Sequence, residues 1–190
     1  MNMTKIVKTA LRARETINTA KVQDAIKEIV RHITGQFDVS ADMAIVGIQT
    51  RGAVLANRVA QAIKKEKGVD VPVGAIDITL YRDDLSTSGI QPIVGETQLN
   101  FEVDGKTIIL IDDVLFTGRT IRAAIDELID FGRPKNITLV VLVDRGHREL
   151  PIEAQFAPIK IATKRSEVVN LSLQESDGSD EIVIGEPIIP

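Results

Sequence analysis

The chain has 190 residues, of which 44% are hydrophobic and 26% charged, a composition that suits one globular α/β domain with a sizeable core. It contains no cysteine, which argues against a disulfide framework or a thiolate metal site and favours a cytoplasmic protein. A net charge of −4 and an aromatic content of 3% argue against a general nucleic-acid binder. No apolar run is long enough to span a bilayer, so we expect no membrane partner.

The N-terminal part of the chain combines a basic segment with an amphipathic helix. Residues 1–20 are basic, and we expect them to be solvated or loosely docked. From Lys21 the apolar residues recur with the helical period, at Val22, Ala25, Ile26, Ile29, Val30 and Ile33. Asn18 or Thr19 is expected to cap this helix, and Gly35 to end it.

Two strands are predicted next. The apolar run Met43–Ile48 predicts a buried strand, and a short polar loop leads from it into a second helix. Arg51, which precedes a glycine, can present its guanidinium and nearby N–H groups to a diphosphate, although an exposed loop arginine is the commoner case. Val71–Leu80 predicts another strand. Residues 82–105, rich in Ser, Thr, Gly and Gln, are expected to form a mobile β-hairpin lid.

The most informative stretch is Ile108–Thr120, which reads IILIDDVLFTGRT. Its four leading apolar residues predict a strand buried on both faces of a parallel sheet, and two acids, Asp112 and Asp113, follow directly. Gly118 allows a ligand to approach the backbone, and the N–H groups that open the following helix can hold a phosphate. The acids suit hydroxyl groups or a divalent cation with oxygen ligands. The alternative is an ordinary strand-to-helix loop with Asp113 or Thr117 as N-cap.

The last part of the chain predicts further strands. Ile137–Val143 is a buried strand, and the polar loop after it, residues 144–151, lies at the same carboxyl edge as the earlier loops. Ligands gather at that edge of an open α/β sheet, so this loop is the natural place to recognise a base. The remaining predicted strands are Lys160–Thr163, Val168–Leu173 and Ile182–Ile184.

The run of apolar residues, two acids and T-G-R-T resembles the phosphoribosyl-diphosphate (PRPP) signature of the type I phosphoribosyltransferases. Together with IDITLYRDDLS (Ile76–Ser86) and VLVDRGHRELPI (Val141–Ile152), it is similar to the bacterial pyrimidine operon attenuation regulators that are also uracil phosphoribosyltransferases. The resemblance implies the type I phosphoribosyltransferase fold, a mainly parallel central sheet flanked by helices with a β-hairpin lid, as one domain over residues 1–190. It also implies the reaction of uracil with PRPP to give UMP and diphosphate, with Mg²⁺.

The resemblance assigns roles to individual residues. Asp112 and Asp113 would hold the ribose hydroxyls and stabilise an oxocarbenium-like transition state, with Mg²⁺ arriving near them on PRPP. Arg82 would neutralise the departing diphosphate, unless it pairs with a neighbouring acid at the surface. The residues expected to hold the PRPP phosphates are Thr50, Arg51, Gly52, Val114, Leu115, Phe116, Thr117, Gly118, Arg119 and Thr120. Those expected to recognise the pyrimidine are Val143, Asp144 and Arg145.

The second implied function is the capture of a pyrimidine-operon leader RNA by the UMP-loaded protein. The expected RNA contacts are Lys27, Arg31, His147 and Arg148. Glu153 and Ile159 stand where family members tend to carry basic residues, so we expect weakened or altered RNA recognition. Two alternatives remain: an RNA-binding attenuator with little enzymatic activity, and a transferase for hypoxanthine, guanine or orotate. The resemblance also implies a dimer or larger homo-oligomer.

Overall fold

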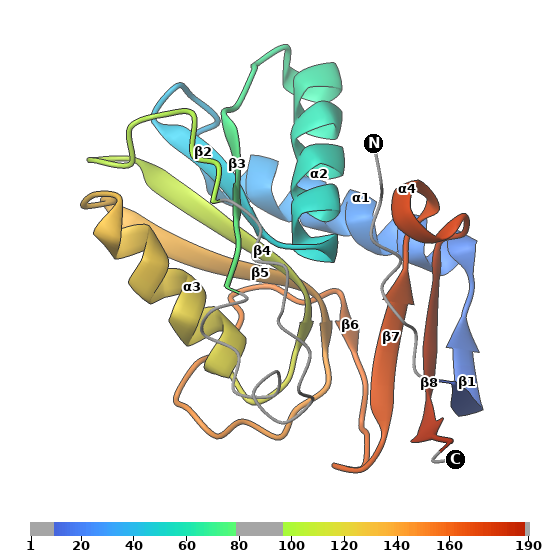
Figure 1. Ribbon diagram of the computed structural model, residues 1–190. Helices are drawn as coiled ribbons and strands as arrows, with labels where there is room; N and C mark the ends of the chain where they lie inside the picture. The colour runs from blue at the N-terminus through green and yellow to red at the C-terminus, as the bar shows by residue number, and fades with distance from the viewer. Residues whose placement is uncertain (1–9, 79–96, 189–190) are drawn as a thin grey trace.

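A computed structural model describes residues 10–78 and 97–188 (Figure 1). The prediction for Arg82, and most of the predicted lid, therefore lie outside the described residues. The elements in chain order are β1 (Leu11–Ile17), α1 (Thr19–Gln36), β2 (Met43–Ile48), α2 (Arg51–Lys67), β3 (Val73–Ile76), β4 (Thr107–Leu115), α3 (Arg119–Asp130), β5 (Asn136–Asp144), β6 (Ile159–Lys160), β7 (Val168–Ser172), α4 (Gln174–Asp177) and β8 (Glu181–Pro187).

The strands form two sheets. The large sheet has five parallel strands in the order β3-β2-β4-β5-β6. The small sheet has three antiparallel strands in the order β1-β8-β7 and stands beside the β6 edge of the large sheet, with α4 at one end (Figure 1). The predicted parallel α/β sheet is confirmed.

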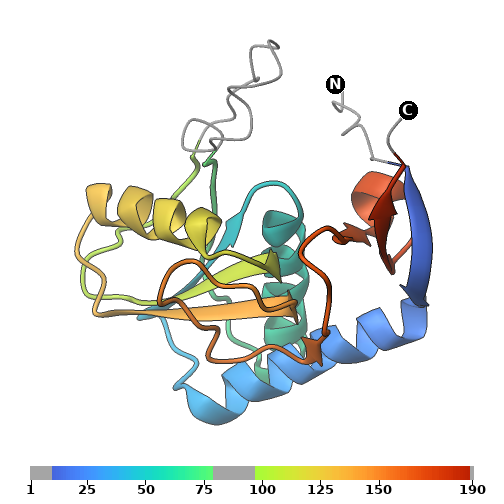
Figure 2. The same cartoon turned by 90° about the horizontal axis from the view of Figure 1, so that it is seen from below.

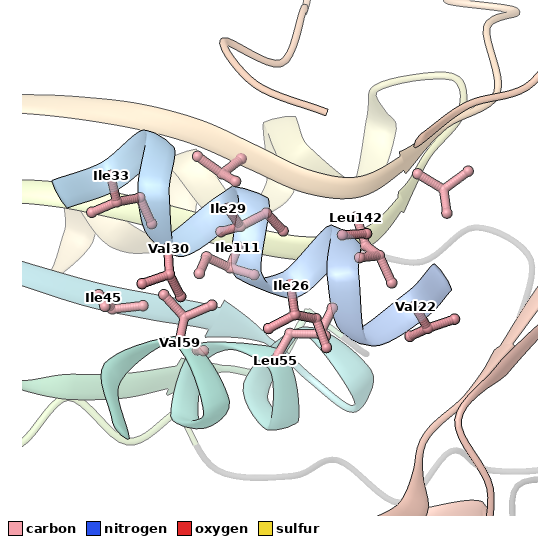
Figure 3. Close-up of a cluster of buried hydrophobic side chains, with 14 of the residues drawn as sticks. Val22, Ile26, Ile29, Val30, Ile33, Ile45, Leu55, Val59, Ile111 and Leu142 are labelled. Carbon is pink, nitrogen blue, oxygen red and sulfur yellow. The ribbon is translucent and has the colours of Figure 1, made fainter. Parts of the chain in front are cut away.

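The large sheet is covered by helices on both faces. Strand β2 is apolar throughout, and β4 and β5 contain the apolar runs Ile108–Ile111 and Leu139–Val143, because alternate side chains enter two separate hydrophobic clusters. Figure 2 shows α3 on one side of the sheet and α1 on the other. One cluster joins α1 and α2 to one face of β2, β4 and β5, as Figure 3 shows for Ile29, Leu55, Ile45, Ile111 and Leu142. The second cluster joins α3 to the opposite face.

Helix α1 follows its predicted apolar face. The six residues with helical spacing are all buried, and the Asn18 side chain caps the start by accepting the Lys21 N–H at 3.1 Å. The predicted end at Gly35 is wrong, because the helix continues to Gln36 and is followed by Phe37 in an extended conformation. Gly35 has open space around it and imposes no turn there.

The small sheet contains an unexpected strand. The prediction that residues 1–20 are loosely docked is wrong for Leu11–Ile17, which pair with β8 along their length apart from one irregularity. Five consecutive side chains of β1 are exposed, so the strand lacks the alternating pattern that would have identified it. Backbone hydrogen bonding to β8, together with the buried Ile17, holds it in place.

The described end of the predicted lid makes a single bridge. Gln98 pairs with Ala75 of β3 through two backbone hydrogen bonds of 2.8 and 3.0 Å, and residues 97–105 contain no other strand pairing. Across the described parts of the chain, no helix has the length and hydropathy to cross a bilayer.

Candidate active site

Three loops meet at one edge of the large sheet. Strands β2, β4 and β5 are parallel and in register, with Gly47 beside Ile111 and Val114 beside Val143. The loops that leave their carboxyl ends, at residues 49–50, 116–118 and 145–152, therefore lie together, as the sequence predicted.

The acid pair lies inside β4, because the strand continues through it to Leu115. Asp112 is 6% exposed, and its Oδ1 accepts the Asp113 N–H at 2.9 Å. Asp113 Oδ1 accepts the Val114 N–H at 2.8 Å. These bonds bend both carboxylates toward the backbone at the strand's end, and neither acid serves as the N-cap of α3.

The predicted phosphate loop after β4 leads into a helix whose N-cap residue has no side chain. This residue is Gly118, in the left-handed region at φ 92°, and the Arg119 N–H donates to the Thr117 hydroxyl in a long bond of 3.4 Å. The carbonyl of Thr117 accepts the N–H groups of Glu149 and Leu150 at 2.9 and 3.2 Å. The first turn of α3 is thus open to an anion, and the loop is held against the β5 loop.

The start of α2 lies against the acid pair. A methyl group at Gly52 would come within 2.6 Å of the Ile111 carbonyl oxygen and 3.2 Å of Asp112 Cα. Gly47 lies similarly close to α2, because a methyl group at Gly47 would lie 2.3 Å from the Gly52 carbonyl oxygen. The peptide between Gln49 and Thr50 is cis, and Thr50 makes no side-chain cap bond to α2. These glycines bring the start of a second helix beside Asp112.

The side chain of Arg51, the first residue of α2, contacts α4. Its side chain is 17% exposed and its Nη2 lies 3.4 Å from Asp177 Oδ1. The Arg51 Nε is buried, and no group among the described residues accepts its hydrogen. Sequence reasoning placed Arg51 at the site but missed Asp177, which lies in a turn-rich acidic segment without a recognisable motif.

Arg145 is a packing residue as well as a member of the β5 loop. It is 6% exposed, its Nη2 donates to the carbonyls of Lys164 and Glu167 at 3.0 and 2.6 Å, and its guanidinium lies 4.1 Å from the Phe116 ring centroid. Burial lowers the pKa of Arg145. The backbone of Arg145 is engaged as well, because its N–H donates to the Leu115 carbonyl at 3.2 Å and its carbonyl accepts the Thr163 hydroxyl at 3.3 Å. Val143 is fully buried.

Arg148 fastens the β5 loop to the phosphate loop. Its Nη1 donates to the Phe116 carbonyl at 2.9 Å, its Nε to the Ile152 carbonyl at 3.0 Å, and its Nη2 to Asp144 Oδ2 at 2.6 Å. Burial raises the pKa of Asp144, but the bonds from Arg148 and the Gly146 N–H outweigh it and leave the pKa below its ordinary value.

The four predicted RNA contacts have different surroundings. Lys27 and Arg31 are exposed on α1, where Lys27 pairs with Asp24 at 2.8 Å. His147 Nε2 lies 2.7 Å from the Thr163 carbonyl, and Arg148 is engaged as described. His32 of α1 stacks on Phe156 at 4.2 Å, which places the helix next to the segment that follows the β5 loop.

An ion-pair cluster that sequence reasoning missed joins α2 to the small sheet. The Arg58 guanidinium bonds both carboxylate oxygens of Asp180 at 2.8 and 2.9 Å, and it also bonds Glu175. These hydrogen bonds raise the pKa of Arg58 and lower those of Glu175 and Asp180. Asp180 is 5% exposed. The residues come from segments more than 110 positions apart, so no local pattern announces them.

Comparison with known proteins agrees with this geometry. The family model described as a phosphoribosyl transferase domain matches residues 14–175. The chain is 50% identical over 172 residues to the bifunctional protein PyrR of Thermus thermophilus, covering 90% of this chain and 95% of the relative. It is 49% identical to the bifunctional protein PyrR of Clostridioides difficile, covering 85% and 92%.

The chain belongs to the phosphoribosyl transferase family, among the bifunctional PyrR proteins. Solved phosphoribosyltransferases share its fold at low identity. The hypoxanthine phosphoribosyltransferase of Trypanosoma cruzi, in complex with the product IMP, aligns with a TM-score of 0.70 at 15% identity, covering 95% of this chain and 98% of that one. The predicted family and fold are confirmed.

Proposed function

We propose that the protein transfers the phosphoribosyl group of PRPP to uracil, forming UMP and diphosphate, and that it also regulates pyrimidine operon transcription in response to UMP. The observation that carries the enzymatic half is the acid pair of β4 between the starts of α2 and α3, at which the N-cap residues Thr50 and Gly118 make no side-chain cap bond. PRPP has a matching layout, with a ribose diol between a 5′-phosphate and a 1-diphosphate. Each helix start offers N–H groups to one anionic end.

The chemistry follows from this placement. Asp112 and Asp113 accept the ribose hydroxyls and favour the positive charge that develops at the anomeric carbon as diphosphate leaves. Residues 117–120 hold the 5′-phosphate, and Thr50 and Arg51 hold the diphosphate. The base approaches from the β5 loop and meets its backbone groups at residues 143–145. No protein nucleophile is needed, because N1 of uracil attacks the anomeric carbon as the bond from that carbon to the diphosphate oxygen breaks, and the N1 proton passes to solvent.

The donor set at the acid pair fits a Mg²⁺ ion that arrives on the substrate. Two carboxylates at one strand end offer the hard oxygen ligands that Mg²⁺ prefers. Among the described residues no group of three or more His, Cys, Asp or Glu side chains could form a complete cage. Such an ion would take most of its ligands from PRPP and water, and it would supply charge neutralisation of the departing diphosphate.

The choice of uracil rests on the likeness to PyrR proteins and on the Asp144–Pro151 loop, which Arg148 braces against the phosphate loop. We would measure nucleotide formation from PRPP and Mg²⁺ with uracil, hypoxanthine, guanine, xanthine and orotate. Turnover with uracil alone is expected. Turnover with a purine or orotate would overturn the base assignment and keep the fold, whereas no turnover would favour a regulator with little enzymatic activity.

The regulatory half of the proposal is the binding of a leader RNA. We also propose, on the resemblance alone, that the protein associates with itself as a homo-oligomer. Lys27 and Arg31 are the accessible cations of the proposed surface, whereas Arg148 would have to break bonds to loop carbonyls to reach a phosphate. A surface with few accessible cations neutralises few RNA phosphates, so binding releases few counterions from the RNA. We expect UMP-dependent binding to the protein's own leader RNA to be weak and to have a shallow salt dependence. Tight binding with a steep salt slope would contradict this expectation.

A further inference from the structure

Two arginines of α2 form ion pairs with the turn at residues 173–180, and these ion pairs differ in the number and length of their hydrogen bonds. Arg58, seven residues after Arg51, is bonded by two carboxylates through four hydrogen bonds to Glu175 and Asp180. Arg51 makes one bond to Asp177, at 3.4 Å, which is long for a charged pair. The first pair has the geometry of a fixed anchor, and the second does not.

The weakly bound guanidinium is nonetheless mostly buried. Arg51 is 17% exposed, and its Nε hydrogen finds no acceptor within the described parts of the chain. A buried donor that lacks a partner costs about 1–3 kcal/mol, and such groups in native proteins commonly have a functional reason. Arg51 is therefore held at the start of α2 with an unsatisfied Nε hydrogen, which the oxygen of an incoming anion could accept.

Asp177 is fixed independently of Arg51. Its Oδ2 accepts the Leu173 N–H at 3.0 Å and the Ser176 hydroxyl at 2.8 Å, so the carboxylate remains in place whether or not Arg51 contacts Oδ1. The carboxylate is 9% exposed. Arg51 can therefore leave Asp177 without disrupting the turn.

We propose that Asp177 is a positioning residue that binds Arg51 as an internal substitute for diphosphate and exchanges it for the diphosphate group during the reaction. This inference rests on the proposed function, in which Arg51 binds the diphosphate. Before diphosphate binds, Asp177 holds the guanidinium beside the start of α2. When PRPP binds, the diphosphate oxygens take the Nε and Nη hydrogens, and the long bond to Asp177 is lost.

The exchange has a consequence for product release. Arg51 returns to Asp177 as diphosphate leaves, so the carboxylate competes with the product for the same cation. Removing the charge of Asp177 removes its competition for Arg51. It also removes the electrostatic repulsion between the Asp177 carboxylate and the bound diphosphate. The mutant protein should therefore bind diphosphate more tightly, which a purely structural role of Asp177 would not produce.

The test is calorimetric binding of Mg-diphosphate to the full-length protein and to Asp177→Asn. Asparagine retains an oxygen that can accept the Leu173 N–H and keeps the shape of the side chain. We expect about two- to fivefold tighter binding, because the single ion pair that is lost is long, at 3.4 Å, and therefore weak. We also expect kcat to fall while the KM for PRPP falls with it, because release of diphosphate becomes slower.

Two further variants separate the possible failures. Asp180→Asn weakens the Arg58 anchor without touching Arg51, so it should lower thermal stability and leave diphosphate affinity unchanged. Arg51→Ala should weaken diphosphate binding, and if it does not, the proposed function of Arg51 fails rather than the exchange alone. Unchanged or weaker binding by Asp177→Asn, with Arg51→Ala impaired, would overturn the exchange and leave the proposed function standing.

Discussion

Replacement of Gly52 by alanine tests the close approach that builds the site. The added methyl group would lie 2.6 Å from the Ile111 carbonyl oxygen and 3.2 Å from Asp112 Cα, and both are backbone atoms of the central strand. Neither can move aside as a flexible side chain would, so α2 has to shift away from β4. Overpacking of this kind costs about 1–3 kcal/mol, which corresponds to a fall in Tm of about 2–12 °C for a protein of this size.

The matched control is Gly35→Ala, because Gly35 also lies in a helix but has no atom within 4 Å of the added methyl group. It should be neutral or stabilise by up to about 1 kcal/mol, since alanine is the better helix former. Thermal unfolding followed by circular dichroism compares the two. Gly52→Ala should also raise the KM for PRPP, because the diphosphate side of the site moves with α2. Equal Tm values for both variants, with unchanged KM, would refute the argument.

Three further predictions concern the acid pair, the ion-pair cluster and the buried arginine. Asp113→Asn should lower kcat by on the order of a hundredfold with an unchanged Tm, and unaltered turnover in a steady-state assay would count against its role. Arg58 lowers the pKa of Asp180 and of Glu175 below their ordinary values of 3.8 and 4.5. The two carboxylates therefore stabilise the folded protein fully when the pH is above these ordinary values. This stabilisation is lost as the pH falls through the lowered pKa values of the folded state. Urea unfolding at pH 6 and pH 3 should show this loss, with a smaller loss in Asp180→Asn. Arg145→Met should lower the free energy of unfolding by about 2–4 kcal/mol, because the carbonyls that it bonds lose their donor, and a change below about 0.5 kcal/mol in urea titration would contradict that role.

The sequence predicted the large sheet well because its signals are local. Uninterrupted apolar runs identified β2, β4 and β5, and the helical period identified the buried face of α1. The acid pair and Gly118 could be placed at a ligand edge, because parallel strands in a row share that edge. The end of β4 was not predicted, because the strand continues through the acids to Leu115 by pairing with β5.

The small sheet and its connections could not be predicted in the same way. Strand β1 exposes nearly all of its side chains and is held by a partner that follows it by about 170 positions. The hydrogen bonds made by the Arg145 and Arg148 side chains could not be predicted for a related reason. A charged residue in a polar loop predicts a ligand contact, whereas here backbone carbonyls from distant segments satisfy both guanidinium groups. Long-range hydrogen bonds of this kind leave no periodic trace in the sequence.

The two sheets share one hydrophobic cluster, and this sharing determines which truncations of the chain can still fold. Ile17, Leu171, Ile182 and Ile184 of the small sheet belong to the same cluster as α1 and the central strands. The small sheet is therefore not an appendage with its own core. Removal of β7 and β8 would uncover the first turns of α1 and strip β1 of its partner, so the truncated chain would lose cooperativity rather than persist as a minimal transferase. Loss of structure in one sheet is energetically coupled to loss in the other.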